Sequence, residues 1–224
     1  MSTNASEKRA TDKKEIQHLI ARRTAKELAG PCTVNLGIGI PTLVAEYIQD
    51  EHVYIHTENG LLGVKDVEEK DIDPNLVNAG KLPAGEATGA SYFNSADSFA
   101  MIRGGHIDVA ILGVLQVDQT GVIANWAVPG KNIMGVGGAM DLLVGAKKVI
   151  LAMTHTNKDG SSKILKECTY PITSTRSVDK IITELAVFEV VDQTLRLVEL
   201  MPGVTIEEVR EKTEADFTQK LGVE

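Results

Sequence analysis

Short apolar runs bounded by glycines are the main pattern along the chain. Residues 107–114 are almost all apolar, which is typical of a strand covered on both faces. Further strands are predicted at residues 33–36, 53–57 and 149–153, and between Gly121 and Trp126. Residues 183–202 are expected to form two paired strands around a turn at Asp192-Gln193.

Apolar residues spaced three or four positions apart predict helices between these strands. The first is expected to begin at Asp12, which with Glu15 has the spacing of a capping box, and to end at Gly30-Pro31. Other helices are predicted over residues 42–48, 95–102 and 139–144, and after Thr205, where Glu208 repeats the capping-box spacing. Strands that alternate with short helices indicate an α/β fold, a single domain with a largely parallel central sheet flanked by helices. We expect this domain to span residues 11–224 and residues 1–10 to be disordered.

Composition and charge narrow the classes of partner. The chain has 224 residues, enough to bury a large core, and 43% of them are hydrophobic. The formal net charge of −8 argues against a nucleic-acid-binding surface. No apolar run approaches the roughly 20 residues that span a bilayer, and the polar N-terminus has no signal-peptide core. We therefore expect a cytoplasmic protein with no nucleic-acid or membrane partner, in which Cys32 and Cys168 are reduced thiols.

Glu58 is the strongest candidate for chemistry. It follows the predicted strand 53–57 and precedes Asn59-Gly60, a pair that favours a tight turn. In open α/β sheets, ligands bind beyond the carboxyl ends of the strands. A carboxylate in that place can act as a nucleophile on an activated acyl group, although a solvated loop glutamate is the alternative interpretation.

The glycine-rich segments do not match nucleotide-binding motifs. Gly37-Ile38-Gly39 and residues 135–138 lack the spacing of the dinucleotide fingerprint, and no P-loop precedes Gly130-Lys131. His52 and His56 flank a predicted strand, and four residues of strand span about 13 Å, too far for one zinc ion. A Gly-x-Ser-x-Gly elbow is also absent. What remains is a carboxylate beside glycine loops, which suits covalent chemistry on an activated substrate without a metal.

Several blocks of the sequence together resemble the family I CoA-transferases. Residues 55–63 are similar to the glutamate signature of that family. The remaining blocks occur in the family's order, at residues 35–41, 78–81, 98–106, 124–131 and 137–142. The match runs from about Glu15 to Glu208, and the length fits the B (β) subunit of a two-subunit 3-oxoacid or butyrate–acetoacetate CoA-transferase. The resemblance implies the CoA-transferase fold of the NagB/RpiA-like type.

The resemblance also implies a reaction with neither metal nor cofactor, in which a CoA thioester is a substrate. Glu58 is implied as the nucleophile that forms an acyl-glutamyl anhydride and then an enzyme–CoA thioester. The backbone N–H of Gly138 is implied as a donor to the oxyanion of each tetrahedral intermediate. Substrate and CoA contacts are implied for Asn35, Gly37, Gly39, Asn59 and Lys81.

An A (α) subunit is the implied partner, supplying a second oxyanion donor in an α2β2 assembly that acts on acyl-CoA and short-chain carboxylic acids. Many family members have a Gly-Pro loop after the signature, whereas residues 64–70 are charged here. The acyl pair therefore stays open among acetoacetate, succinate, acetate, butyrate and 3-oxoadipate. A sugar-phosphate isomerase is a competing function, but it would need clustered basic or hydroxyl groups near the glycine loops. A non-catalytic regulatory subunit is another, which the intact Glu58 disfavours.

Overall fold

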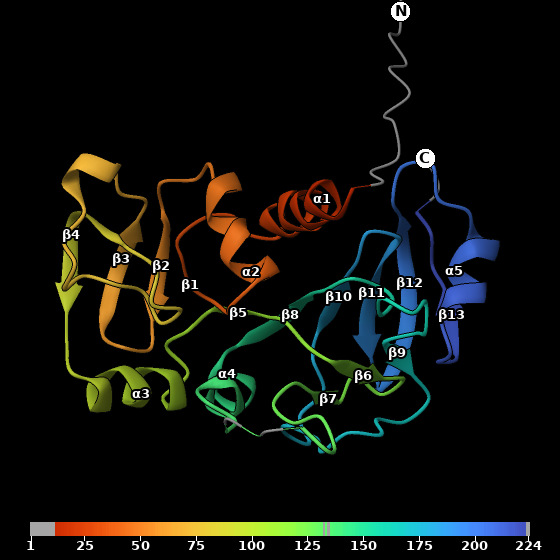
Figure 1. Ribbon diagram of the computed structural model, residues 1–224. Coiled ribbons are helices and arrows are strands. Elements are labelled where there is room, and N and C mark those ends of the chain that lie inside the picture. The colour runs from red at the N-terminus through yellow and green to blue at the C-terminus, as the bar shows by residue number, and fades with distance from the viewer. Residues whose placement is uncertain (1–11, 132, 134, 223–224) are drawn as a thin grey trace, which may run out of the picture.

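A central parallel sheet organises the chain (Figure 1). The structure is a computed structural model that describes residues 12–131, 133 and 135–222, so the predicted disorder of residues 1–10 lies outside it. Within the described residues, ten strands form one sheet in the order β13-β12-β11-β10-β8-β5-β1-β2-β3-β4. Its five parallel middle strands are β2 (Val53–Thr57), β1 (Cys32–Leu36), β5 (Val109–Leu112), β8 (Lys148–Ala152) and β10 (Lys180–Ile182). The predicted α/β fold with a largely parallel sheet is thus confirmed.

Antiparallel strands extend the sheet at both sides. β3 (Leu61–Lys65) and β4 (Gly85–Tyr92) follow β2, while β11 (Ala186–Val191) and β12 (Thr194–Leu200) follow β10. β13 (Phe217–Gln219) then pairs with β12 in parallel. The turn between β11 and β12 lies at Asp192 and Gln193, both with positive φ, as the sequence predicted.

Helices cover the two faces of the sheet in separate groups. Figure 1 shows α1 (Lys13–Ala25) and α2 (Ile40–Leu43) above the strands, and α3 (Ser95–Arg103) and α4 (Ala139–Gly145) below them. The 3₁₀ turn η1 (Val44–Tyr47) packs with the first group, and α5 (Ile206–Lys212) with the second. A small sheet of β7 (Ile123–Ala124), β6 (Gln116–Asp118) and β9 (Ile164–Leu165) also joins the second group.

The apolar run predicted as a doubly covered strand is β5, and its residues alternate between two cores. Val109 and Ile111 pack with α1 and η1, whereas Ala110 and Leu112 pack with α3 and α4. All four side chains are buried. The sheet is therefore held rigidly from both faces at its centre, next to the edge where the candidate site lies.

The structure differs locally from the prediction at α3, α2 and β4. The helix predicted over residues 95–102 is α3, and the residue before it, Asn94, caps it, because the Asn94 side-chain oxygen accepts the N–H of Asp97. The predicted helix 42–48 is one α-turn followed by η1, starting at Ile40 after Gly39, whose φ is +95°. β4 was not predicted, because its Gly-Glu-Ala-Thr-Gly-Ala sequence lacks apolar alternation; as an edge strand it is largely exposed.

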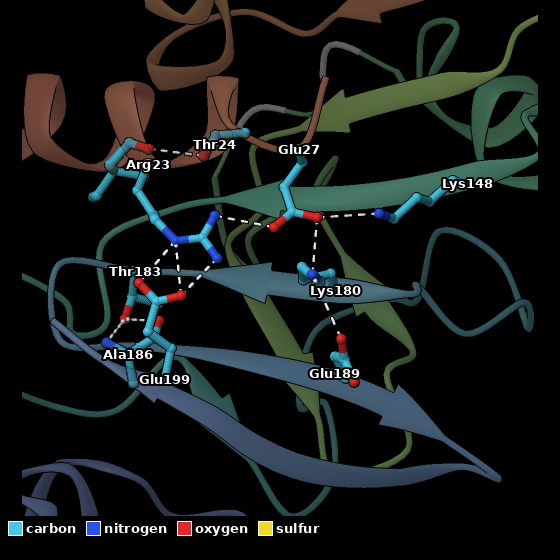
Figure 2. A network of polar contacts seen from close by, with 10 residues as sticks. Arg23, Thr24, Glu27, Lys148, Lys180, Thr183, Ala186, Glu189 and Glu199 are labelled. Atoms are coloured by element: carbon cyan, nitrogen blue, oxygen red, sulfur yellow. Dashed lines mark hydrogen bonds and ion pairs between the residues drawn. The ribbon is translucent and has the colours of Figure 1, made fainter. Parts of the chain in front are cut away.

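A network of ion pairs fastens the end of α1 to the sheet (Figure 2). The guanidinium of Arg23 donates to Glu199 of β12 at 2.7–3.0 Å and to Glu27 at 3.0 Å. Glu27 in turn accepts from Lys148 of β8 at 3.1 Å and from Lys180 of β10 at 2.8 Å. Three strands are thereby tied to one helix.

No helix among the described residues is long and apolar enough to cross a membrane.

Candidate active site

Glu58 lies in the tight loop that joins β2 to β3. The N–H of Gly60 donates to the carbonyl of Thr57 at 3.1 Å, which closes a turn around Glu58 and Asn59. Gly60 has φ +117°, and a side chain there would meet the carbonyl oxygen of Phe93 at 2.0 Å. Only glycine fits this position, so the predicted turn has a second purpose: it brings the loop against the segment that leads into α3.

The loop opens into a cavity of about 620 Å³ at the carboxyl edge of the parallel strands. Three adjacent strands contribute the residues that follow them: Gly37 after β1, Glu58 after β2 and Gly113 after β5. The opposite wall is the glycine-rich approach to α4, including Gly137 and Gly138. This is the edge at which open α/β sheets bind ligands.

Gly138 lies directly against the side chain of Glu58. A methyl group at Gly138 would be 3.2 Å from both Cγ and Oε1 of Glu58. Gly138 precedes α4 as its N-cap with φ −77°, a conformation open to any residue. A side chain at this position would therefore crowd the Glu58 carboxyl group while leaving the backbone angles undisturbed.

Burial raises the pKa of the Glu58 carboxyl above its ordinary value, and the residue's own backbone N–H opposes this in part. Among the described residues that line the cavity, Glu58 carries the one charged side chain. The described lining contains no lysine or arginine that could neutralise its charge. A poorly hydrated carboxylate facing a cavity is equipped for nucleophilic or general-base chemistry.

The structure brings together four of the residues that the sequence singled out. Glu58, Gly138, Gly37 and Asn59 all line the cavity. The amide of Asn59 donates to the carbonyl of Val77 at 2.7 Å, which ties the loop to the segment before β4.

The other three lie outside this wall. Asn35 is buried in β1, where it contacts His56. Gly39 and Lys81 are exposed on neighbouring loops, Lys81 with φ 62°. The geometry therefore divides the predicted residues into those that line the cavity together with Glu58 and those that do not.

Cavity residues for which the sequence predicted no role include Gly113, Ser95, Phe99 and Asn125. Gly113 could have been found, because it follows a strongly predicted strand at the same edge. Asn125 lies in the family-like block 124–131, but nothing in the sequence gave it a role of its own. Its side-chain oxygen accepts the hydroxyl of Thr173 at 2.8 Å, a contact between segments 48 residues apart.

A second cavity of about 460 Å³ adjoins the first and shares Leu36, Ile38 and Ala79 with it. Lys65 and Asp66, from the charged segment 64–70, line this second cavity and not the one that holds Glu58. The departure from the family's usual loop thus lies beside the site, outside the wall around the carboxylate.

The histidines do not form a metal cluster. His52 is exposed while His56 is buried, and no group of three or more His, Cys, Asp or Glu in the described part of the chain could hold a metal ion. His155 is enclosed by the hydroxyls of Thr183 and Thr213, at 3.0 and 2.8 Å, and burial lowers its pKa to about 4. It is a structural core histidine.

Comparison with known proteins agrees with this geometry. The sequence pattern of the family described as "Coenzyme A transferase" matches residues 18–212. The chain belongs to the coenzyme A transferase family. The resemblance found in the sequence blocks is therefore confirmed across nearly all of the described chain.

Relatives of this coenzyme A transferase chain include separate B or β subunits. It is 53% identical to the B subunit of a probable succinyl-CoA:3-ketoacid coenzyme A transferase of Bacillus subtilis, over 94% of this chain and 98% of the relative. It is 52% identical to the β subunit of the acetate CoA-transferase of Escherichia coli, over 88% of this chain and 91% of the relative.

A solved structure shares the fold. The acyl-CoA transferase YdiF of Escherichia coli O157:H7 matches with a TM-score of 0.75 at 23% identity. The match covers 96% of this chain but 44% of the YdiF chain, so this coenzyme A transferase spans less than half the length of that protein.

Proposed function

We propose that residues 11–224 form the B subunit of a two-subunit CoA-transferase, which moves CoA from an acyl-CoA to a carboxylic acid through a covalent intermediate on Glu58. The observation that carries the proposal is the position of the Glu58 carboxylate. It is partly buried, it faces the cavity at the carboxyl edge of the sheet, and it lies against Gly138. A carboxylate with little water around it is well suited to attack a thioester.

The reaction balances without a metal or redox partner. A carboxylate oxygen of Glu58 attacks the thioester carbonyl, and the C–S bond breaks. CoA departs as its thiolate, and an acyl-glutamyl anhydride remains on Glu58. The thiolate then attacks the glutamyl carbonyl of Glu58, which releases the first acid as its carboxylate and leaves a Glu58–CoA thioester. A second carboxylate repeats these steps in reverse, departs as its CoA ester and restores Glu58.

Each attack creates an oxyanion, and the backbone N–H of Gly138 is our candidate donor. The support is the contact between Gly138 and the Glu58 side chain. When the glutamyl carbonyl is attacked, its oxygen becomes the oxyanion, so a donor has to lie next to the carboxyl group itself. Removing one donor of this type typically costs roughly 100- to 1,000-fold in rate.

A partner subunit would complete the site. An anhydride on Glu58 must be shielded from water, or the enzyme would hydrolyse acyl-CoA. Apolar side chains are exposed on the cavity wall and on a helix that contributes to it. Ile38 of the lining is 74% exposed, and Val144 and Met140 of α4, the helix that places Ala139 and Leu142 in the lining, are 66% and 46% exposed. Covering these residues with an A subunit would exclude water and add a second donor. An α2β2 assembly is the most economical symmetric form.

The competing functions fit less well. A sugar-phosphate isomerase needs cationic groups for its phosphate, whereas the described cavity lining contains no lysine or arginine. A regulatory subunit would have no use for a desolvated glutamate held against a glycine. For substrate contacts, we keep Gly37 and Asn59 at the cavity wall, and propose that exposed Gly39 and Lys81 meet the CoA moiety from the rim.

The acids to test are those that the sequence left open, and the names of the relatives point first to succinyl-CoA, 3-ketoacids and acetate. The complex of this chain with its A subunit would be incubated with acetoacetyl-CoA or succinyl-CoA and, in turn, acetate, acetoacetate, succinate, butyrate or 3-oxoadipate. We expect CoA to appear on at least one of these acids without ATP. Hydrolysis of the thioester without transfer to any acid would contradict the proposal.

A further inference from the structure

Two polar side chains are buried side by side beneath the Glu58 loop. Asn35 of β1 and His56 of β2 are paired in the register of the sheet, and each is 1% exposed. His56 projects toward α3, where the hydroxyl of Ser98 is fully buried. Polar groups in such positions cost free energy unless they are hydrogen-bonded, and apolar residues would fill the space more simply.

The hydrogen bonds fix the direction of the His56 ring. The side-chain nitrogen of Asn35 lies 3.1 Å from Nδ1 of His56 and 3.3 Å from the His56 carbonyl oxygen. A group that faces a carbonyl at this distance must be the NH₂ of the amide, so Nδ1 is an acceptor and the ring proton is assigned to Nε2. Burial lowers the pKa of His56 to about 4, which keeps the ring neutral at neutral pH.

Ser98 links the His56 ring to the backbone of the loop through two hydrogen bonds. Nε2 of His56 donates to the Ser98 hydroxyl at 3.1 Å. The hydroxyl then donates to the carbonyl of Thr57 across 3.4 Å. That carbonyl belongs to the peptide unit whose N–H is the N–H of Glu58, the same group that interacts with the Glu58 carboxylate.

Phe93 closes the remaining side of the ring. It stacks on His56 with a centroid separation of 5.8 Å and an interplanar angle of 14°. Its N–H also donates to the carbonyl of Gly60 at 3.0 Å. The histidine is therefore held by contacts on its face and at both nitrogens, and those contacts converge on the loop from Thr57 to Gly60.

We propose that Asn35, His56 and Ser98 are positioning residues: their hydrogen-bond chain fixes the Thr57–Glu58 peptide and thereby holds the Glu58 carboxylate against Gly138. This inference rests on the proposed role of Glu58 as the nucleophile. It also gives Asn35 a different role from a direct CoA contact. The chain acts on the orientation of the nucleophile, so its loss should slow formation of the covalent intermediate more than it weakens acyl-CoA binding.

The test measures how fast CoA becomes attached to Glu58 when acyl-CoA is mixed with the complex of this chain and its A subunit, using rapid quench and peptide mass analysis. Ser98→Ala should slow attachment about 10- to 100-fold with little change in KM for acyl-CoA. The matched control is Thr24→Ala, which removes another fully buried hydroxyl that donates to a backbone carbonyl, at 2.8 Å in α1. It should leave the attachment rate unchanged.

Rescue separates positioning from packing. His56→Gln keeps one donor for Ser98 and one acceptor for Asn35, and should retain more of the rate than His56→Leu. Equal attachment rates in Ser98→Ala and Thr24→Ala would overturn the inference. If Ser98→Ala does not fold, equal rates in the two His56 variants would overturn it. If the wild-type complex attaches no CoA to Glu58, the result contradicts the proposed function itself and not only this inference.

Discussion

The Cα of Gly138 faces the carboxyl group of Glu58 so closely that a methyl group there would be 3.2 Å from Oε1. These two residues come from segments 80 positions apart, one at the end of β2 and one at the start of α4. Their contact defines the site, because it places the only proposed donor of this chain beside the only charged group of the described cavity lining.

Gly138→Ala should therefore displace the Glu58 carboxylate without disturbing the backbone, whose φ of −77° suits alanine. We expect turnover to fall on the order of 10- to 100-fold, with acyl-CoA binding largely retained. Steady-state kinetics and a binding titration would check this. Gly222→Ala, a glycine with nothing within 4 Å, is the control. Unchanged turnover in Gly138→Ala would show that the contact has no part in the reaction.

Gly60→Ala should destabilise the protein by at least about 3 kcal/mol, because it adds a steric clash to an unfavourable φ. The new Cβ would be 2.0 Å from the Phe93 carbonyl oxygen. Gly160 also has positive φ, but nothing lies within 4 Å of its missing side chain. Gly160→Ala should thus cost only about 1 to 2 kcal/mol. Urea unfolding measures both, and similar losses would contradict the close approach.

Glu27 should make stability depend on pH. Burial alone raises its pKa, but hydrogen bonds from Lys180, Arg23 and Lys148 outweigh this and lower it to about 2, from an ordinary 4.5. Because the folded pKa is depressed, the stabilisation is complete above about pH 4.5 and is lost as the pH falls toward 2. Glu27→Gln should lower the free energy of unfolding by about 3 kcal/mol at neutral pH.

Denaturant unfolding at a series of pH values tests this sign. The difference between wild type and Glu27→Gln should shrink as the pH falls below about 4.5. Glu189→Gln is the control, since Glu189 is 40% exposed and reaches Lys180 only at 3.5 Å; its effect should stay below about 1 kcal/mol. A Glu27 effect that is constant across the acidic range would refute the proposed linkage.

The chain alone should be inactive as a transferase. Exposed Ile38 lines its cavity, Met140 and Val144 are exposed on the adjoining helix α4, and the chain contributes one proposed oxyanion donor. Adding the A subunit should restore transfer and give a complex whose mass, measured by light scattering, matches two copies of each chain. Full transfer by the isolated chain would mean that it carries the whole site.

The sequence was most informative where structure is decided locally. Strand 53–57 has the predicted bounds, because Val53, Tyr54 and Ile55 are β-prone and Asn59-Gly60 ends the strand. The edge strand β4 has no such pattern, since pairing and not burial holds it in the sheet.

Contacts between distant segments could not be predicted from residue types. His56 was considered only as a metal ligand, and its partners Asn35 and Ser98 lie 21 and 42 residues away. The pairing of Glu58 with Gly138 likewise had no local signal and entered only through the family resemblance. The carboxyl-edge rule, in contrast, pointed to the position of Glu58, which lines a cavity at that edge together with Gly37.

Covalent attachment at Glu58 is the most direct test of the account. The complex of this chain with its A subunit would be treated with acetoacetyl-CoA in the absence of an acceptor acid, digested, and the peptides weighed. The account predicts that the peptide containing Glu58 gains the mass of CoA less one water, as a thioester requires, and that Glu58→Ala folds normally, gains no such mass and transfers no CoA. Substantial transfer by Glu58→Ala, or CoA attached to a different residue, would contradict the account.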